Sequence, residues 1–345
     1  MIPTNAVSRA SVWHSDDLRQ DTSWVKIFTE ADIGELETAA ENLKARGLSF
    51  YEFGRDDFSL PTLGEKLQAS VLDVENGRGV QLWRGIDPGR YDETTLKILY
   101  WGIGCHLGTP IPHNAAGDLI GHVRDQGGDY MSRNTRGYTT RARLAPHCDA
   151  SDIVTLLCVH PAKSGGESCI ASSIAIFNDI LATRPDDLKP LFNGFHFDLR
   201  GEGAGEGANE VTHNRVPVFS YLEDRLSCRY NRKTIEDGQA RMGEPLSGDV
   251  LEAVRHVGEL AASDRFRFDM TFEQGDIQIL NNHIILHSRE NFEDWPEPER
   301  KRNLLRMWIN LDESVARPLA PEFADRMNTG PRGGVAVRQK IKEGS

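Results

Sequence analysis

The sequence predicts a mainly β protein with flanking helices, folded as a jelly roll. From about residue 119 onward, short apolar runs alternate with Gly, Pro, Asn and Asp, the pattern of strands separated by turns. Roughly eight such strands suit a jelly roll of two sheets. Helical periodicity is confined to a few segments, most of them N-terminal or between the strands.

The first 64 residues are expected to form an N-terminal arm and a helix that packs on the core. Residues 1–28 show little periodicity. The helix would follow Thr29 as its N-cap and end at Gly47. Four apolar side chains would then share one face: Ile33, Leu36, Ala40 and Leu43.

Residues 65–315 are expected to form the jelly-roll domain, and residues 316–345 a C-terminal tail. A buried strand is predicted at 79–84 and a helix from about Asp92, with Leu96, Leu99, Tyr100 and Ile103 on its apolar stripe. Two more helices are predicted at 172–184 and 247–262, and a loop or lid at 201–213. The further strands are predicted at 119–124, 139–145, 152–159, 194–199, 216–220, 225–231, 266–271, 276–281 and 302–311.

Composition excludes several classes of function. Apolar residues make up 39% of the chain, enough for a sizeable core, and the formal net charge of −12 argues against general nucleic-acid binding. No segment is apolar enough to span a membrane or to act as a secretory signal, so we expect a cytoplasmic protein. The five cysteines lack CxxC spacing, which fits a reducing compartment. A homo-oligomer is compatible with this sequence.

The first chemical motif is Pro146-His147-Cys148-Asp149, at the end of a predicted strand. Side chains at i and i+2 of a strand point to the same face, so His147 and Asp149 can present a nitrogen and an oxygen to one metal ion. A His-x-Asp tripeptide alone is weak evidence, because it also occurs by chance.

The second motif runs from Gly275 to Arg289 and carries two histidines, His283 and His287. Either can supply a third ligand, and strand parity does not distinguish them because both positions are odd. A histidine on an apolar strand is usually a hydrogen-bonded core residue, and we expect one of the two to be that.

The third motif is the segment 300–309, in which Arg302 and Arg306 share a face of a predicted strand. A solvated cationic edge is the ordinary interpretation. The apolar residues between and after these arginines indicate a buried strand instead, where a guanidinium needs an anionic partner. A bound dicarboxylate would provide one through bidentate pairing.

Two histidines and one carboxylate on one face of an octahedral ion leave three positions open, the arrangement of non-haem iron(II) oxygenases. Zinc has no redox chemistry and is normally bound by four ligands. The arginine after the last histidine favours 2-oxoglutarate as the reductant.

As a set, these motifs resemble the taurine dioxygenase/2,4-dichlorophenoxyacetate dioxygenase (TauD/TfdA) family of Fe(II)- and 2-oxoglutarate-dependent dioxygenases. The resemblance covers roughly residues 65–311 in order and spacing. It implies a double-stranded β-helix, a form of jelly roll, with helices on its outer face. The matching segments are HCD at 147–149, SGGES at 164–168, GDIQILNNHIILHSRENFED at 275–294 and KRNLLRMW at 301–308.

The resemblance also implies roles for individual residues. His147, Asp149 and His287 match the iron ligands, and His287 is preferred to His283 because it ends the Asn-x-x-x-x-His stretch. Arg302 matches the residue that pairs with the distal carboxylate of 2-oxoglutarate, and Ser168 replaces a threonine that donates to the same carboxylate. Arg306 matches a second arginine that contacts the co-substrate or an anionic substrate.

The expected reaction uses O2 and 2-oxoglutarate to hydroxylate a small organic substrate, or to cleave it after hydroxylation, with release of succinate and CO2. An anionic substrate is one option. Taurine itself is not favoured, because His113 is out of register with the sulfonate-binding histidine of taurine dioxygenase. The retained carboxylate of Asp149 favours hydroxylation over halogenation. Weaker candidates for the pocket are Arg229, Tyr230 and Asn231, and, at its entrance, Arg141 and Arg143.

Two other functions remain open from the residues alone. One is a cupin-like metal oxygenase that does not use 2-oxoglutarate, in which Arg302→Ala would have little effect. The other is a jelly-roll binding module without catalysis, which would not depend on iron.

Overall fold

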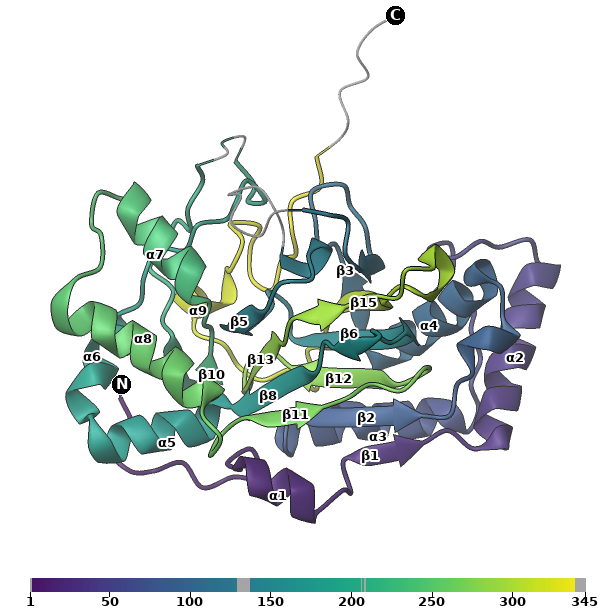
Figure 1. Ribbon diagram of the computed structural model, residues 1–345, viewed down its shortest axis with the longest axis horizontal. Coiled ribbons are helices and arrows are strands. Elements are labelled where there is room, and N and C mark those ends of the chain that lie inside the picture. The colour runs from purple at the N-terminus through teal and green to yellow at the C-terminus, as the bar shows by residue number, and fades with distance from the viewer. Residues whose placement is uncertain (1, 129–136, 206, 208, 339–345) are drawn as a thin grey trace, which may run out of the picture.

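The computed structural model describes residues 2–128, 137–205, 207 and 209–338. Two β-sheets lie at its centre and helices surround them on both sides (Figure 1). Residues 206 and 208 of the predicted loop and residues 339–345 of the predicted tail lie outside this description. No helix within the described ranges combines the length and the apolar character that crossing a membrane requires.

The larger sheet contains seven strands among the described residues, and its central strands pair in antiparallel fashion. All side chains of β12 are buried. Helices cover one face of the sheet at this strand, and the smaller sheet lies on the side of the other face. In spatial order the strands are β1 (Val25–Ile27), β2 (Val80–Arg84), β12 (Ile277–Asn281), β6 (Ile153–His160), β15 (Asn303–Asn310) and β3 (Thr109–Ile111), and β4 (Gly121–Val123) also pairs with β15.

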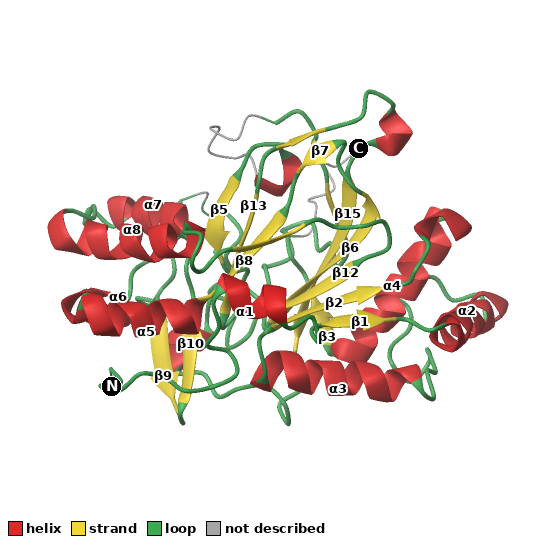
Figure 2. Cartoon of the chain, turned by 60° about the horizontal axis from the view of Figure 1, so that its bottom comes forward, coloured by secondary structure: helices red, strands yellow, loops and turns green. Residues whose placement is uncertain are grey.

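The smaller sheet carries the segments that matter most for function. Its order is β11 (Phe268–Met270), β8 (Ser168–Ser172), β13 (Ile285–Arg289) and β5 (Leu144–His147). Figure 2 shows β5, β13 and β8 side by side, next to the larger sheet. Two short pairs complete the strands: β9 (Phe219–Leu222) with β10 (Arg225–Cys228), and β7 (Ser164–Gly165) with β14 (Phe292–Glu293).

Two helices, α3 (Leu63–Asn76) and α4 (Glu93–Leu107), pack against the outer face of the larger sheet, and α2 (Glu30–Ala45) packs against α4. The predicted cap of α2 is confirmed, since the Asp32 amide donates to Oγ1 of Thr29 and the Asp32 carboxylate accepts from the Thr29 amide. The apolar face predicted for this helix is buried. These helices and the sheet form one of two apolar core clusters.

The second core cluster lies between the smaller sheet and the remaining helices. These are α5 (Ser173–Thr183), α6 (Leu188–Asn193), α7 (Arg232–Arg241) and α8 (Gly248–Ala262), with α1 (Ser15–Gln20) and α9 (Pro321–Ala324) near the chain ends. Short 3₁₀ helices occur at Pro88–Arg90, Gly137–Thr139, Pro185–Asp187 and Pro298–Arg300.

The predicted strands at 79–84, 152–159, 276–281 and 302–311 are confirmed, as are the helices at 172–184 and 247–262. The strand predicted at 194–199 is wrong, because only isolated bridges from Phe195 and Asp198 occur there. The prediction also lacks the strands β1, β3, β7, β8, β13 and β14 and the helices α1, α3, α6, α7 and α9. "Mainly β" describes the centre of the fold, but the described helices contain more residues than the strands.

Candidate active site

The pairing of β5 with β13 places His147 directly opposite His287. The centroids of the two imidazole rings are 4.4 Å apart. Asp149 follows β5 by two residues, and its carboxylate lies beside both rings. One ligand atom from each of these three residues lies within 4.8 Å of the others. The predicted two-histidine, one-carboxylate cluster therefore forms in space.

The hydrogen bonds around the two imidazoles leave one ring nitrogen of each available. Nδ1 of His147 is 2.8 Å from the carbonyl oxygen of Ala145, which makes Nδ1 the protonated nitrogen and leaves Nε2 with a lone pair. Nε2 of His287 is buried and has no hydrogen-bond partner among the described residues. These two atoms lie 3.9 and 4.0 Å from oxygens of Asp149, so a small cation fits between them.

The carboxylate of Asp149 is held from several sides. Trp308 donates from Nε1 to Oδ2 at 2.9 Å, and Nη1 of Arg306 is 3.6 Å from the same oxygen. The side-chain oxygen of Asn282 accepts from the Asp149 backbone amide at 3.1 Å. Burial alone would raise the pKa of Asp149, but Arg306 and the two imidazoles outweigh it and hold the pKa well below its usual range. The carboxylate is therefore ionised at neutral pH.

Burial has the opposite effect on the two histidines. It lowers the pKa of His147, and it lowers the pKa of His287 to about 3, with the neighbouring His147 adding to the effect. Both imidazoles are neutral at pH 7, which is the form that binds metals.

His283 does not join this cluster. It precedes β13 in the turn after β12, and its Nε2 donates to Oδ1 of Asp152 at 2.8 Å, with both side chains 1% exposed. Arg326 and Arg332 reach the same carboxylate from the C-terminal segment. The structure thus makes His283 the hydrogen-bonded core histidine and His287 the member of the cluster.

Replacing His283 with leucine is expected to lower the free energy of unfolding by about 1–3 kcal/mol, because a buried carboxylate loses a donor. Metal binding should not change, since His283 lies outside the cluster. Denaturant unfolding and Fe(II) titration of the same variant measure both quantities. A variant that loses Fe(II) but keeps its stability would reverse the assignment of the two histidines.

The same residue gives a pH dependence of stability. Burial lowers the pKa of His283 from 6.5 to about 3 in the folded state. Below about pH 6.5 the unfolded chain therefore binds a proton that the folded chain does not, and stability falls as the pH decreases toward 3. This single titration changes the free energy of unfolding by up to ~1.4 kcal/mol per pH unit, and we expect His283→Leu to remove this contribution. Urea unfolding of both proteins between these pH values measures the difference, and equal slopes would contradict it.

Arg302 and Arg306 are both buried, and each has guanidinium nitrogens without a hydrogen-bond partner among the described residues. Arg306 lies between the rings of Tyr138 and Trp308, with Cζ 4.5 and 5.3 Å from their centroids. Arg302 packs over Phe292 at 4.9 Å, and burial lowers its pKa to about 10. Each arginine can therefore accept an anionic partner.

Ser168 lies at the start of β8, and its hydroxyl is 3.0 Å from Nε2 of Gln278 on the larger sheet. Arg302 lines a cavity of about 720 Å³ that is separate from the one beside the histidines. Gly166 packs close to this arginine, since a Cβ there would lie 3.2 Å from Nε of Arg302. The SGGES segment and Arg302 are thus neighbours, as the resemblance implies.

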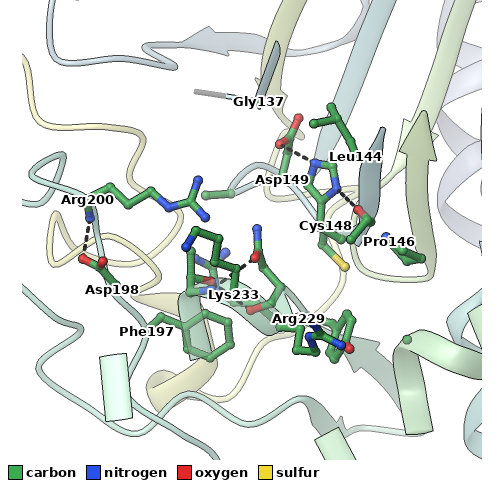
Figure 3. A pocket seen from close by; sticks show the side chains of 18 of the residues that line it. Gly137, Leu144, Pro146, Cys148, Asp149, Phe197, Asp198, Arg200, Arg229 and Lys233 are labelled. Atoms are coloured by element: carbon green, nitrogen blue, oxygen red, sulfur yellow. Dashed lines mark hydrogen bonds and ion pairs between the residues drawn. The ribbon is translucent and has the colours of Figure 1, made fainter. Parts of the chain in front are cut away.

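A second cavity, of about 650 Å³, opens beside His147 and Asp149 (Figure 3). Arg143, Arg229, Tyr230 and Asn231 line it, whereas Arg141 and His113 are not among its lining residues. The hydroxyl of Tyr230 donates to the Val254 carbonyl oxygen at 2.9 Å, so this tyrosine has a structural bond.

The sequence analysis missed three polar residues around the site: Trp308, Asn282 and Gln278. Trp308 shares the even-numbered face of β15 with Arg306, so strand parity could have identified it. Asn282 begins the Asn-x-x-x-x-His stretch, but the pattern does not show that it accepts from the Asp149 amide, and nothing in the pattern marks Gln278, because both partners come from distant segments.

Comparison with known proteins identifies the family. The sequence model described as "Taurine catabolism dioxygenase TauD, TfdA family" matches residues 43–308. FR-33289 synthase from Streptomyces rubellomurinus is 32% identical over 322 residues, which cover 90% of this chain and 92% of the relative. Taurine hydroxylase-like protein SAT17 from Stachybotrys chartarum is 28% identical, with 92% and 82% covered.

Solved structures share the fold. Asparagine oxygenase in complex with Fe(II), 2S,3S-3-hydroxyasparagine and succinate superimposes with a TM-score of 0.66 at 16% identity, covering 88% of this chain and 98% of that one. The non-haem iron oxygenase OrfP with Fe and alpha-ketoglutaric acid gives a TM-score of 0.63 at 15% identity, with 91% and 99% covered. The chain is thus an enzyme that belongs to the TauD/TfdA family of non-haem iron dioxygenases, which use 2-oxoglutarate and O2.

Proposed function

We propose that this enzyme binds Fe(II) through His147, Asp149 and His287 and hydroxylates a small organic substrate, with 2-oxoglutarate converted to succinate and CO2. The observation that carries the proposal is the convergence of these three side chains within 4.8 Å. Two structural relatives were solved in complex with hydroxylated amino acids, asparagine oxygenase with 2S,3S-3-hydroxyasparagine and OrfP with (3S)-hydroxy-L-Arg, which supports hydroxylation as the reaction.

The protein's own residues prepare the metal site. Nε2 of His147 is kept unprotonated, Nε2 of His287 has no hydrogen-bond partner among the described residues, and Asp149 is kept ionised by Arg306 and Trp308. His147, Asp149 and His287 would hold the iron, and the iron would supply the redox chemistry with 2-oxoglutarate and O2. Because Asp149 occupies the carboxylate position, hydroxylation is favoured over halogenation.

Two buried arginines fit the co-substrate. We assign Arg302 to the distal carboxylate of 2-oxoglutarate, since its Nη1 is buried without a hydrogen-bond partner in the described part of the chain. Ser168 can turn its hydroxyl from Gln278 to the same carboxylate. Arg306, beside Asp149, is placed to contact either the co-substrate or an anionic substrate.

We further propose that the two sheets are the halves of a double-stranded β-helix. β5, β8 and β13 would form one half, and β6, β12 and β15 the other. Residues 1–64 would then be an N-terminal addition, 65–315 the catalytic domain and 316–345 a C-terminal tail, whose residues 317–326 pack against the core. Arg317 and Arg326 support this packing of the tail, since each forms an ion pair with a buried carboxylate of the preceding segments.

Replacing Trp308 with phenylalanine is expected to weaken Fe(II) binding by about 10- to 100-fold, the usual effect of losing a hydrogen bond to a metal ligand. Phenylalanine keeps the ring contact with Arg306 and removes the N–H donor. Anaerobic calorimetry with Fe(II) measures the affinity. An unchanged affinity would show that Trp308 only packs.

The proposed activity is tested with purified, iron-loaded protein by measuring succinate release together with O2 uptake across a panel of small organic compounds. We expect at least one compound to stimulate both, in equal amounts and only with Fe(II) present. A cupin-like oxygenase would consume O2 without forming succinate. A binding module would show no iron dependence. Either result would contradict the proposal.

A further inference from the structure

The cavity beside His147 and Asp149 contains a buried cation that the metal site does not use. Arg229 is 8% exposed and lines this cavity. Figure 3 shows Arg229 and Phe197 on one side of the cavity and Asp149 on the opposite side. Cζ of Arg229 is 5.2 Å from the centroid of the Phe197 ring. The guanidinium is therefore held against an aromatic face within the pocket.

The backbone fixes Arg229 relative to the metal ligands. The Cys148 amide donates to the Tyr230 carbonyl oxygen at 2.8 Å, and Asn231 forms a bridge with His147. Arg229 is two residues from Asn231, on the order of 7 Å along an extended chain. The segment that carries Arg229 is therefore paired with the segment that carries His147, and both residues line the same cavity.

The charge of Arg229 is not balanced by any carboxylate within 4.0 Å among the described residues. One nitrogen, Nη2, donates to the Arg326 carbonyl oxygen at 3.2 Å, and Nε is buried without a hydrogen-bond partner in this part of the chain. Other buried arginines differ: Arg317 is 2.7 Å from Glu75 and Arg326 is 3.6 Å from Asp152.

Several other cations on the cavity wall have acidic partners. Arg143 lies 3.3 Å from Glu290, and three others pair within helices: Arg232 with Glu236, Lys233 with Asp237 and Arg255 with Glu252. A buried, uncompensated guanidinium is costly, and it is normally retained where a ligand supplies the opposite charge. Burial also lowers the pKa of Arg229 to about 9, which still leaves it charged at pH 7.

We propose that Arg229 binds an oxyanion of the organic substrate and so determines substrate specificity. The substrate would carry a carboxylate, sulfonate or phosphonate at one end and would present a nearby C–H bond to the metal site. Phe197, Leu199 and Met327 on the same cavity would contact the carbon atoms between. This inference rests on the proposed function, because it names the substrate class of the same site.

Small anions test the binding step without a known substrate. The protein is loaded with Mn(II) and 2-oxoglutarate without O2, so that the proposed co-substrate site at Arg302 is filled. Acetate, methanesulfonate and inorganic phosphate are then titrated, with chloride at equal ionic strength as the blank, and the melting temperature is followed. Ligands that bind only the folded state raise it. We expect at least one oxyanion to do so, and its identity gives the type of group.

The decisive variant is Arg229→Gln, which keeps an N–H donor for the Arg326 carbonyl but removes the charge. Without anion it should melt at or above the wild-type temperature, because an uncompensated buried charge is gone. Its apparent affinity for the anion should be at least tenfold weaker. Arg317→Gln is the matched control, since it removes a buried arginine with a carboxylate partner: it should melt lower and keep the anion response.

Several outcomes would overturn the inference. The first is that no oxyanion raises the melting temperature of the wild type. The second is that an oxyanion raises the melting temperature of Arg229→Gln as much as that of the wild type. The third is that Arg229→Gln melts at a lower temperature than the wild type and keeps its response to the anion. If Arg229→Gln does not fold, Arg229→Lys gives the same test, because it keeps the charge but loses the bidentate geometry and should bind more weakly.

Turnover then separates this inference from the proposed function. Short acids that stimulate succinate release in wild type should do so far better than their uncharged amides, and Arg229→Gln should lose this preference while still binding Fe(II) and 2-oxoglutarate. Equal stimulation by acids and amides would contradict the role of Arg229 alone. Absence of succinate with every compound would contradict the proposed function instead.

Discussion

Replacing Asp149 with alanine is expected to lower Fe(II) affinity by more than about 100-fold, since even outer-shell partners of metal ligands contribute about 10- to 100-fold. Substrate-stimulated succinate release should fall to background. The physical reason is that Asp149 supplies the only anionic ligand atom in the described cluster, between two neutral imidazoles. Anaerobic Fe(II) titration and a succinate assay on the same preparation measure the two effects.

His287→Ala should behave like Asp149→Ala, and His283→Leu should bind Fe(II) like the wild type. This contrast controls for general damage to the segment 283–287. His283 is the more deeply buried of the two histidines, so its replacement should disturb the segment more, whereas Nε2 of His287 is the atom without a hydrogen-bond partner in the described chain. If Asp149→Ala binds Fe(II) normally, the metal lies elsewhere.

Replacing Arg302 with glutamine is expected to raise the KM for 2-oxoglutarate by roughly 100-fold, because breaking a buried charge pair costs about 3 kcal/mol or more. Fe(II) affinity should be unchanged, since Arg302 is absent from the ligand cluster. Initial rates of succinate formation at varied 2-oxoglutarate concentration measure the effect.

The matched control is Arg300→Gln, two residues upstream. Arg300 is about half exposed, and it packs over Trp295 and lies 3.8 Å from Glu297, so its loss should leave the KM near the wild-type value. Equal KM values for Arg302→Gln and wild type would remove Arg302 from the co-substrate site and would favour an oxygenase that does not use 2-oxoglutarate.

Local patterns in the sequence predicted much of this structure. The capped helix after Thr29 and the buried strand that contains Arg306 follow from spacing alone, whereas Arg302 lies just before that strand. Helix α3 has the same kind of spacing in Leu63, Leu67, Val71 and Val74, yet the prediction omits it. Strands β8 and β13 were missed because both are short and contain polar residues, and they pair with each other and with β11 and β5, which come from distant parts of the sequence.

Some residues of the site could likewise be predicted from local spacing, and others depend on contacts between distant segments. His147 and Asp149 are two residues apart, so strand geometry could pair them. The choice of His287 over His283 required the family resemblance. Its physical basis is that the β5–β13 register places His287 opposite His147, whereas His283 is hydrogen-bonded to the buried Asp152. The role proposed for Arg229 could not be predicted from the sequence. It depends on the three-dimensional structure, in which this buried guanidinium has no carboxylate nearby among the described residues.

The central claim is that a single iron binds between β5 and β13. The most direct measurement is a crystal structure grown without O2 in the presence of Fe(II) and 2-oxoglutarate, with anomalous diffraction recorded at the iron edge. We expect one strong peak about 2 Å from Nε2 of His147, Nε2 of His287 and a carboxylate oxygen of Asp149. A peak coordinated by other residues, or none at this position, would contradict the account.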